Sequence, residues 1–257
     1  MSTTPLKLDS SDPWVQPGSP LYLHVRRGIA ELIQSGEWAP GAAISPEKKL
    51  CERFGVSMGT LRKAVDELTA SGLLVRQQGR GTFVSQHSQG RYLFSFFHLV
   101  GLDGKKEYPE VRFLKLKPTQ ADAAAAEALN LQTGAALLCL SNLLSLKGQA
   151  VSLDEIYLPS ALYPGLTAAV LRGRQTTLYQ MYQDDFGVTV VSAIERVRGV
   201  AATAAMSRLL EVEVGAPLLR IARTAYSFHH QPVELRYSYV NTQHCEYRPD
   251  AFVQEPG

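Results

Sequence analysis

The chain has 257 residues, of which 45% are hydrophobic, and a formal net charge of +2 at pH 7. This length and hydrophobic content suffice for the cores of one large or two modest domains, which excludes a chain that is disordered throughout. The small net charge excludes a uniformly basic protein. A surface that binds nucleic acid would therefore have to be a local one.

The cysteines and the apolar segments restrict the compartment. Cys51, Cys139 and Cys245 are far apart and outside any Cys-x-x-Cys spacing, which argues against a disulfide framework and a zinc site. No apolar run approaches the roughly 20 residues of a membrane helix. Residues 1–19 are polar and rich in Pro and Ser, unlike a signal peptide. We therefore expect a cytoplasmic protein with a flexible N-terminal arm and no membrane partner.

The residues after the arm divide into two domains and a linker. Residues 20–85 show helical periodicity and then two short strand signals around a glycine-rich turn. Residues 86–90 are polar and end in glycine, as is typical of a linker. In residues 91–257 short apolar runs alternate with helical stretches, which predicts an α+β domain.

Two segments of the second domain show similar patterns. Leu131 to Ala135 and Glu213 to Pro217 each lie between an Ala-rich helical stretch and an apolar, strand-like run. The helical stretches are Gln120 to Leu129 and Thr203 to Leu210, and the strand-like runs are Ala136 to Leu144 and Leu218 to Tyr226. We expect two similar helix–strand units in one sheet.

A helix and then a second, short helix are predicted at the start of the first domain. In the first, from about Leu21 to Ser35, apolar residues recur at helical spacing, and Gly36 follows. The second begins at Ser45 or Pro46 and ends at Gly55, residue types that favour the two ends of a helix.

A third helix follows after one turn. Ser57 is placed to cap its N-terminus, and Leu61, Val65 and Leu68 form its apolar stripe. Two short helices joined by a glycine turn are the helix-turn-helix pattern, whose second helix enters the major groove of DNA. Arg62, on the polar face, is the leading candidate for reading a guanine edge.

Other polar side chains of this unit are candidates for contacts that set the register on DNA. Lys48, in the first turn of the second helix, and Thr60 are expected near the phosphate backbone. Ser57 and Lys63, on the third helix, complete the candidates on the helices.

A hairpin follows the third helix. Leu73 to Gln77 and Thr82 to Val84 are strand-like, and the turn between them carries Arg80 at its tip. Glycines allow the backbone to approach DNA closely, and an arginine at a tip suits the narrow, electronegative minor groove. We therefore add Gln78, Gly79 and Arg80 to the candidate DNA contacts.

These features also have simpler explanations. An Arg-Lys pair on a helix is usually a solvated face, and three-helix units with hairpins also bind other proteins. Residues 21–85 contain nine Lys and Arg against six Asp and Glu, which is a small excess. The order and spacing of the elements, rather than their charge, therefore favour DNA binding.

Several strings of the first domain are distinctive in combination. They include Pro20-Leu21-Tyr22, Ser35-Gly36-Glu37-Trp38, Phe54-Gly55-Val56-Ser57, Thr60-Leu61-Arg62-Lys63-Ala64 and Gln78-Gly79-Arg80-Gly81-Thr82-Phe83-Val84. In this order they resemble the DNA-binding domain of GntR-type bacterial regulators. The resemblance implies DNA contacts at Lys48, Thr60, Arg62, Gly79 and Arg80, and a homodimer that reads a palindromic operator.

Two departures from the family pattern bear on the operator. Ile44-Ser45-Pro46-Glu47 shifts by one place the proline of the family's usual Leu-Pro-Ser-Glu. Met58, followed by Gly59, stands where the family usually has an arginine. A good bidentate arginine contributes roughly 1 to 3 kcal/mol of discrimination between bases. We therefore expect an operator that departs from the family's commonest half-site, or weaker binding to that half-site.

The second domain has its own set of strings. They include Tyr157-Leu158-Pro159, Pro164-Gly165-Leu166, Thr177-Leu178-Tyr179, Gly187-Val188, Gly215-Ala216-Pro217-Leu218-Leu219 and Pro232-Val233-Glu234. In this order they resemble the UTRA sensor domain of the HutC-like branch of the GntR family, whose fold is similar to that of chorismate lyase. The resemblance implies a mainly antiparallel sheet and a pocket for a small-molecule effector.

The resemblance places six residues in this pocket: Ser95, Asn142, Asp154, Thr177, Glu234 and Tyr239. Sugar-phosphate sensors of the branch have two arginines on the strand of Asn142 and Leu144, so their bidentate phosphate clamp is missing here. We therefore expect no phosphosugar, but a neutral, cationic or less charged ligand held by Asp154 and Glu234. Alternatively, these carboxylates lie at solvated strand ends or pair with Arg236 and Arg220.

The sequence therefore predicts an α+β protein with an N-terminal winged helix-turn-helix domain and a C-terminal chorismate-lyase-like α/β sensor domain. We expect a sequence-specific transcription repressor whose operator binding responds to the effector. No cofactor or metal is expected, because His229-His230 have no third evident ligand. An enzyme of chorismate-lyase-like fold is an alternative, although no catalytic signature stands out. A scaffold that binds no DNA is another, and it would lack the steep salt dependence of phosphate contacts.

Overall fold

The computed structural model describes residues 20–70, 72–86 and 96–249. Contacts between Cα atoms divide the chain into two compact units, with the boundary after Gln86. The predicted arm and most of the predicted linker lie outside the described residues. Within them, no helix has the length and hydropathy that crossing a membrane requires.

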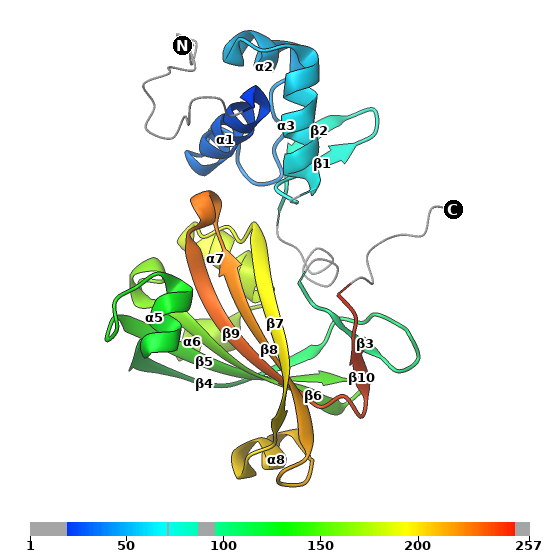
Figure 1. Ribbon diagram of the computed structural model, residues 1–257, viewed down its shortest axis with the longest axis vertical. Coiled ribbons are helices and arrows are strands. Elements are labelled where there is room, and N and C mark those ends of the chain that lie inside the picture. Colours follow the sequence, from blue (N-terminus) through cyan, green and yellow to red (C-terminus); the bar gives the residue numbers. More distant parts are fainter. Residues whose placement is uncertain (1–19, 71, 87–95, 250–257) are drawn as a thin grey trace. The chain divides into compact units, whose positions relative to one another are not determined.

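The first unit contains the predicted helices and hairpin (Figure 1). They are α1 (Leu21–Gln34), α2 (Glu47–Phe54), α3 (Met58–Ala70), β1 (Leu74–Gln77) and β2 (Gly81–Val84). The strands β1 and β2 are antiparallel. The winged helix-turn-helix prediction is therefore confirmed.

The angle between the helices of this unit depends on two glycines. A Cβ atom at Gly28 of α1 would lie 2.6 Å from Cε1 of Phe54, so only glycine lets α2 pack this closely. Gly55 adopts φ 65°, a left-handed conformation that ends α2 and redirects the chain into α3. Val25, Ile29 and Leu61 are fully buried between the helices.

The second unit is built on a six-stranded sheet in which every neighbouring pair of strands is antiparallel, as predicted. In spatial order the strands are β4 (Glu110–Gln120), β5 (Ala136–Leu146), β6 (Gln149–Pro159), β9 (Pro232–Val240), β8 (Pro217–Tyr226) and β7 (Ser192–Ala201). A separate two-stranded ladder joins β3 (Leu99–Gly101) to β10 (Cys245–Tyr247).

Helices pack on both faces of the six-stranded sheet (Figure 1). On one face, here called the inner face, α6 (Ala168–Gly173) and α7 (Leu178–Phe186) close the largest apolar cluster. On the other, the outer face, α5 (Ala123–Leu129) covers Leu137 and Leu235, whereas α8 (Ala204–Leu210) covers a separate cluster. The 3-10 helix Ser160–Leu162 lies between β6 and α6, and the 3-10 helix Phe228–His230 lies between β8 and β9.

The sheet consists of two similar halves, β4-α5-β5-β6 and β7-α8-β8-β9, which meet where β6 pairs with β9. In the first half the amide of Ala121 donates a hydrogen bond to the carbonyl of Ala135. In the second half the amide of Ala202 donates a hydrogen bond to the carbonyl of Ala216. The expectation of two similar helix–strand units is therefore confirmed. The first helix begins at Ala123 rather than Gln120, because β4 extends to Gln120 and Asp122 caps the helix.

Candidate DNA-binding surface and effector site

The N-terminus of α3 presents the first group of predicted DNA contacts. The Ser57 hydroxyl accepts a hydrogen bond from the Thr60 amide at 3.3 Å and lies 3.0 Å from the Thr60 hydroxyl. Ser57 therefore caps the helix as the sequence predicts. Met58, the first residue of α3, is 38% exposed. Its thioether offers no hydrogen-bond donor to a base or a phosphate.

The cations of α3 are held by side chains of the other two helices. Arg62 is exposed, and its Nε lies 3.0 Å from a carboxylate oxygen of Glu47 on α2. Lys63 Nζ lies 4.0 Å from the centre of the Tyr22 ring on α1. Lys48, on α2, is exposed. The Arg62 and Lys48 side chains are therefore both accessible from solvent.

The turn of the hairpin carries the remaining predicted contacts. Gly79 and Gly81 adopt positive φ angles of 71° and 116°, which a residue with a side chain rarely adopts. The amide of Arg80 donates to the Gln77 carbonyl at 2.9 Å. The exposed Arg80 guanidinium lies 5.7 Å from the Phe83 ring centre. Gln78 is also exposed, so the tip of the wing is polar and accessible.

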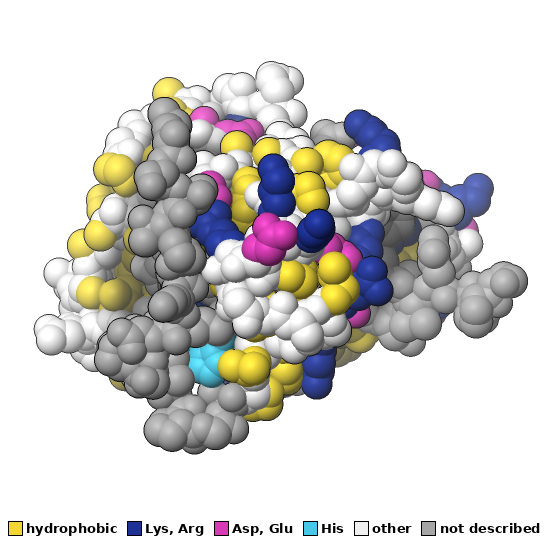
Figure 2. Space-filling model, turned by 90° about the horizontal axis from the view of Figure 1, so that it is seen from above, with side chains coloured by type: hydrophobic (Ala, Val, Ile, Leu, Met, Phe, Trp, Pro, Cys, Tyr) yellow, Lys and Arg dark blue, Asp and Glu magenta, His cyan; other side chains and the backbone are white. Residues whose placement is uncertain are grey.

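The cations of the first unit alternate with carboxylates. Arg76 pairs with Asp66 at 2.7 Å, and Arg26 pairs with Glu67 at 3.2 Å. Figure 2 likewise shows one face of the molecule on which Lys and Arg side chains are interspersed with Asp and Glu. Because Arg62 is paired with Glu47 in the same way, ion pairing does not distinguish this predicted DNA contact from the other surface cations.

Three of the predicted effector residues share the inner face of the sheet. Asn142 on β5 and Asp154 on β6 are directly opposite each other, and Glu234 lies on the next strand. All three are buried. Arg236 joins the two carboxylates, with Nη1 3.1 Å from Asp154 and Nε 2.9 Å from Glu234. The sequence alternative that these carboxylates pair with an arginine thus holds for Arg236.

Helix α7 meets this cluster at Glu234. The hydroxyls of Tyr179 and Tyr182 donate to its carboxylate at 3.1 and 2.8 Å. Burial, and then the charge of Glu234, raise the pKa of Tyr182 well above its usual value. Thr177 is buried and caps α7, accepting from the Gln180 amide at 3.1 Å. Sequence reasoning missed both tyrosines, although Tyr179 belongs to a string that resembles the family.

The remaining two predicted effector residues are not brought to this cluster. Tyr239 lies on the outer face, against the cluster that contains Leu143 and Leu218, because neighbouring residues of β9 alternate between faces. Ser95 lies outside the described residues.

Two small cavities flank the Asp154–Arg236 pair. One, of about 10 Å³, is lined by Asn142, Leu144, Tyr108 and other side chains, and the second, of about 20 Å³, reaches the segment that begins at Phe96. Each has room for about one water molecule. The Oδ1 atom of Asn142 is buried and has no hydrogen-bond partner among the described residues. The polar cluster therefore contains an unused acceptor at a cavity wall.

A second buried polar cluster fastens the start of this unit to the sheet. Arg223 donates to the carbonyl of Phe96 and pairs with Glu195, which also contacts Tyr247 and lies 3.1 Å from His98 Nδ1. Burial raises the pKa of Glu195, but its hydrogen bond with His98 and the charge of Arg223 outweigh that effect and lower it to about 2. Sequence reasoning did not identify this cluster.

Comparisons with known proteins agree with both units. Residues 21–84 match the model of bacterial regulatory proteins of the gntR family, and residues 105–246 match that of the UTRA domain. The chain is 31% identical to the probable fructoselysine utilization operon transcriptional repressor of Escherichia coli K12, over 84% of this chain and 88% of that protein. It is 29% identical to the histidine utilization repressor of Pseudomonas putida, over 81% of this chain and 83% of that one.

A solved structure supports the assignment of the second unit. The ligand-binding domain of a protein assigned to the GntR family, from Bordetella bronchiseptica, matches with a TM-score of 0.56 and 32% identity. The match covers 59% of this chain and 94% of that one. The relatives carry the names of transcription regulators. The chain therefore belongs to the GntR family, in the HutC-like branch with a UTRA domain, and is a DNA-binding regulator modulated by an effector.

Proposed function

We propose that the chain acts as a homodimeric repressor of a palindromic operator, and that a small polar effector on the inner face of the UTRA sheet sets its operator affinity. The names of the relatives support repression. A two-fold symmetric dimer presents two equal DNA-binding units, which matches a palindrome.

In this proposal α3 lies in the major groove, with Arg62 on a guanine. Arg62 must first leave Glu47, but an exposed ion pair contributes only about 0 to 1 kcal/mol. A bidentate contact to guanine contributes about 1 to 3 kcal/mol of discrimination. The exchange therefore favours the base. Thr60 and Lys48 then contact the phosphate backbone, and Arg80 at the tip of the wing contacts the minor groove.

The effector proposal rests on one observation, the unpartnered Oδ1 atom of Asn142. A buried acceptor without a partner costs about 1 to 3 kcal/mol, a cost that a bound ligand with a donor would remove. Asp154 and Arg236 form a shared wall of both adjoining cavities. Movement of this pair would join the cavities into one site.

The cluster favours an effector with both donors and acceptors and without a phosphate group. Asp154 and Asn142 Oδ1 accept hydrogen bonds, whereas Arg236 donates them. Two carboxylates already compensate Arg236, and a leucine occupies position 144 beside them. A doubly charged phosphate would therefore meet more negative charge than positive charge at Arg236.

The same site is connected to the chain that leads to the DNA-binding unit. The larger of the two cavities is lined by Phe96 and His98 as well as by Asp154, and Arg223 and Glu195 fasten this segment to the sheet. Displacement of the segment by an effector would alter the spacing of the two DNA-binding units in the dimer, and so shift the population that fits the operator.

A thermal-shift screen of the purified protein tests this proposal. The panel contains amino acids, organic acids, amines, sugars and sugar phosphates, and a ligand that binds the folded state raises the melting temperature. We expect a non-phosphorylated compound to stabilise the protein, and to change its affinity for promoter DNA in fluorescence anisotropy.

Two variants on the same strand make the screen specific. Asn142→Ala removes the inner-face acceptor and should abolish the stabilisation, whereas Ser141→Ala, on the outer face, should preserve it. A panel without any stabilising compound, or equal loss in both variants, contradicts the effector site. Monomers at operator-binding concentrations in sedimentation velocity contradict the dimer.

A further inference from the structure

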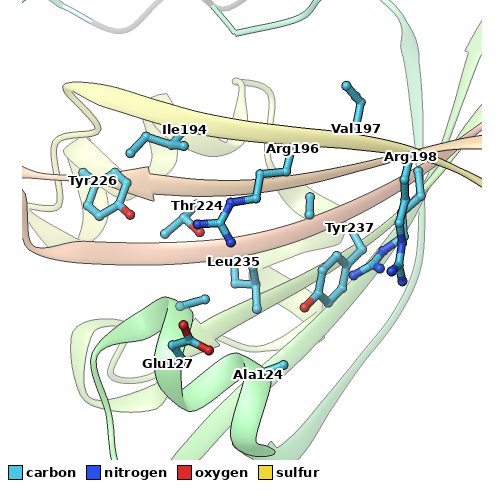
Figure 3. Close-up of a pocket in the computed structure, with 13 residues that line it drawn as sticks. Ala124, Glu127, Ile194, Arg196, Val197, Arg198, Thr224, Tyr226, Leu235 and Tyr237 are labelled. Carbon is cyan, nitrogen blue, oxygen red and sulfur yellow. The ribbon is translucent and has the colours of Figure 1, made fainter.

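One hollow of the UTRA unit is a groove on the outer face of the sheet, away from the effector cluster. It has a volume of about 390 Å³, within the range of small-molecule sites. Strands β7, β8 and β9 form its floor, and α5 forms a wall beside this floor (Figure 3). Asn142, Asp154 and Arg236 point to the opposite face, so this groove is a separate candidate site.

The strand register explains the open floor of the groove. Ala222 on β8 lies between Arg196 on β7 and Tyr237 on β9, so a small side chain separates two large ones. One pair further along, Thr224 lies between Ile194 and Leu235 in the same way. The small side chains of Ala222 and Thr224 therefore leave a shallow, partly apolar floor, which suits a flat ligand.

Three arginines converge on one side of this floor. Arg198 and Arg220 are directly opposite each other on neighbouring strands, and Arg196 precedes Arg198 on the same face. Figure 3 shows Arg196 and Arg198 extending from β7 on the groove side. Like charges directly opposite each other destabilise a pair of strands. Among the described residues no carboxylate forms an ion pair with any of the three.

The environment of Arg220 adds an independent observation. Its guanidinium carbon lies 4.1 Å from the centre of the Tyr237 ring, which fixes the side chain along the floor. Its Nε atom is buried and has no hydrogen-bond partner within the described part of the chain. Two carboxylates are near, Glu127 on α5 and Glu155 opposite Tyr237 on β6. Three cations against two anions leave an excess of positive charge.

The other half of the sheet shows that the fold does not require these arginines. Lys117 and Cys139 occupy the positions that correspond to Arg198 and Arg220, as the matching registers of β4–β5 and β7–β8 show. The strands of the first half pair in the same register although Cys139 stands in the position of Arg220. The opposed arginines are therefore a property of the groove rather than of the sheet.

From these observations we propose that the groove binds a flat organic anion, a carboxylate or a phosphate on an aromatic or similarly planar body. The paired guanidinium groups offer parallel donors to the acid group, and Tyr226 and Tyr237 line the groove beside the planar body. A second copy of this chain is a poorer occupant, because charged side chains on an edge strand oppose pairing between chains. The arginines of the second copy would also face the arginines of the first copy, and these like charges repel each other.

Isothermal titration calorimetry on the full chain tests the proposal with three probes: benzoate, phenyl phosphate and the uncharged phenol. We expect at least one of the two anions to bind and phenol not to bind, and the preferred anion identifies the acid group. Arg198→Gln and Arg220→Gln each remove one positive charge and should lower the affinity for that anion roughly tenfold or more. Lys117→Gln removes the corresponding charge in the other half and should leave the affinity unchanged.

Three results would overturn the proposal. They are an absence of binding by both anions, equal binding by phenol, and equal weakening in the Lys117→Gln control. Sedimentation velocity tests whether a second copy of this chain occupies the groove instead. If Arg198→Gln changes the oligomeric state of the protein and neither anion binds, the groove is a contact between subunits and the small-ligand proposal is wrong.

Discussion

Glu195 on β7 and Arg223 on β8 are directly opposite each other in the sheet and form a buried ion pair. Through the carbonyl of Phe96, Arg223 also holds the segment with which the described part of the UTRA unit begins. One ion pair thus connects the sheet to the part of the chain nearest the DNA-binding unit in sequence.

The substitution Glu195→Gln should destabilise the UTRA unit by about 3 to 5 kcal/mol, because it leaves the buried Arg223 without its counter-charge. Urea denaturation followed by tyrosine fluorescence measures this change. Asp103→Asn is the control, since Asp103 pairs with Lys147 at an exposed site and its loss should have much less effect. Equal destabilisation by both variants would contradict a special role for the buried pair.

The same carboxylate predicts how stability depends on pH. Its pKa is lowered from 4.5 to about 2 in the folded protein, so its contribution is fully present above pH 4.5 and is lost as the pH falls toward 2. The difference in unfolding free energy between the wild type and Glu195→Gln should therefore shrink as the pH falls from about 4.5 toward 2. Urea titrations at several pH values measure it, and a difference that grows toward low pH would contradict this sign.

Asn142→Leu should stabilise the protein and abolish its response to effector. The substitution replaces an unpartnered buried acceptor with an apolar side chain, which removes a cost of about 1 to 3 kcal/mol. The melting temperature should rise, and a stabilising compound from the screen should no longer raise it further. A variant that is less stable but still responds would show that Asn142 serves packing rather than binding.

Much of the first unit could be predicted because its signals are local. Caps, glycines and the spacing of apolar residues lie within a few positions of the helix ends that they determine, as Ser57 and Gly55 illustrate. The two halves of the UTRA sheet could also be anticipated, because the segments around Gly134 and Gly215 repeat the same local pattern.

The polar clusters of the second unit could be predicted only in part. Resemblance identified Asp154 and Glu234, but whether Arg236 or Arg220 pairs with them depends on which face of the sheet each arginine occupies. Tyr239 lies on the other face for the same reason. Glu195 and His98 are 97 residues apart in sequence, so no local pattern signals their contact.

Arg62→Ala should weaken operator binding about fivefold to 150-fold, the loss expected of a guanine contact worth about 1 to 3 kcal/mol. The dependence of affinity on salt should stay almost unchanged, because a base contact releases no phosphate counterion. Fluorescence anisotropy at several salt concentrations measures both quantities. Arg27→Ala is the control, since Arg27 pairs with Glu31 on α1; a similar loss in this variant would mean that Arg62 acts only through its charge.

Met58→Arg should strengthen binding to a guanine-containing half-site and change which operators the protein prefers. Met58 begins α3 and is exposed, so a longer side chain can extend toward the major groove without disturbing the core. The added guanidinium should contribute about 1 to 3 kcal/mol against mismatched bases at one position of each half-site. Selection from a randomised operator library, repeated for the wild type and the variant, measures the preference. Identical selected sequences and equal affinities would show that position 58 does not face the bases.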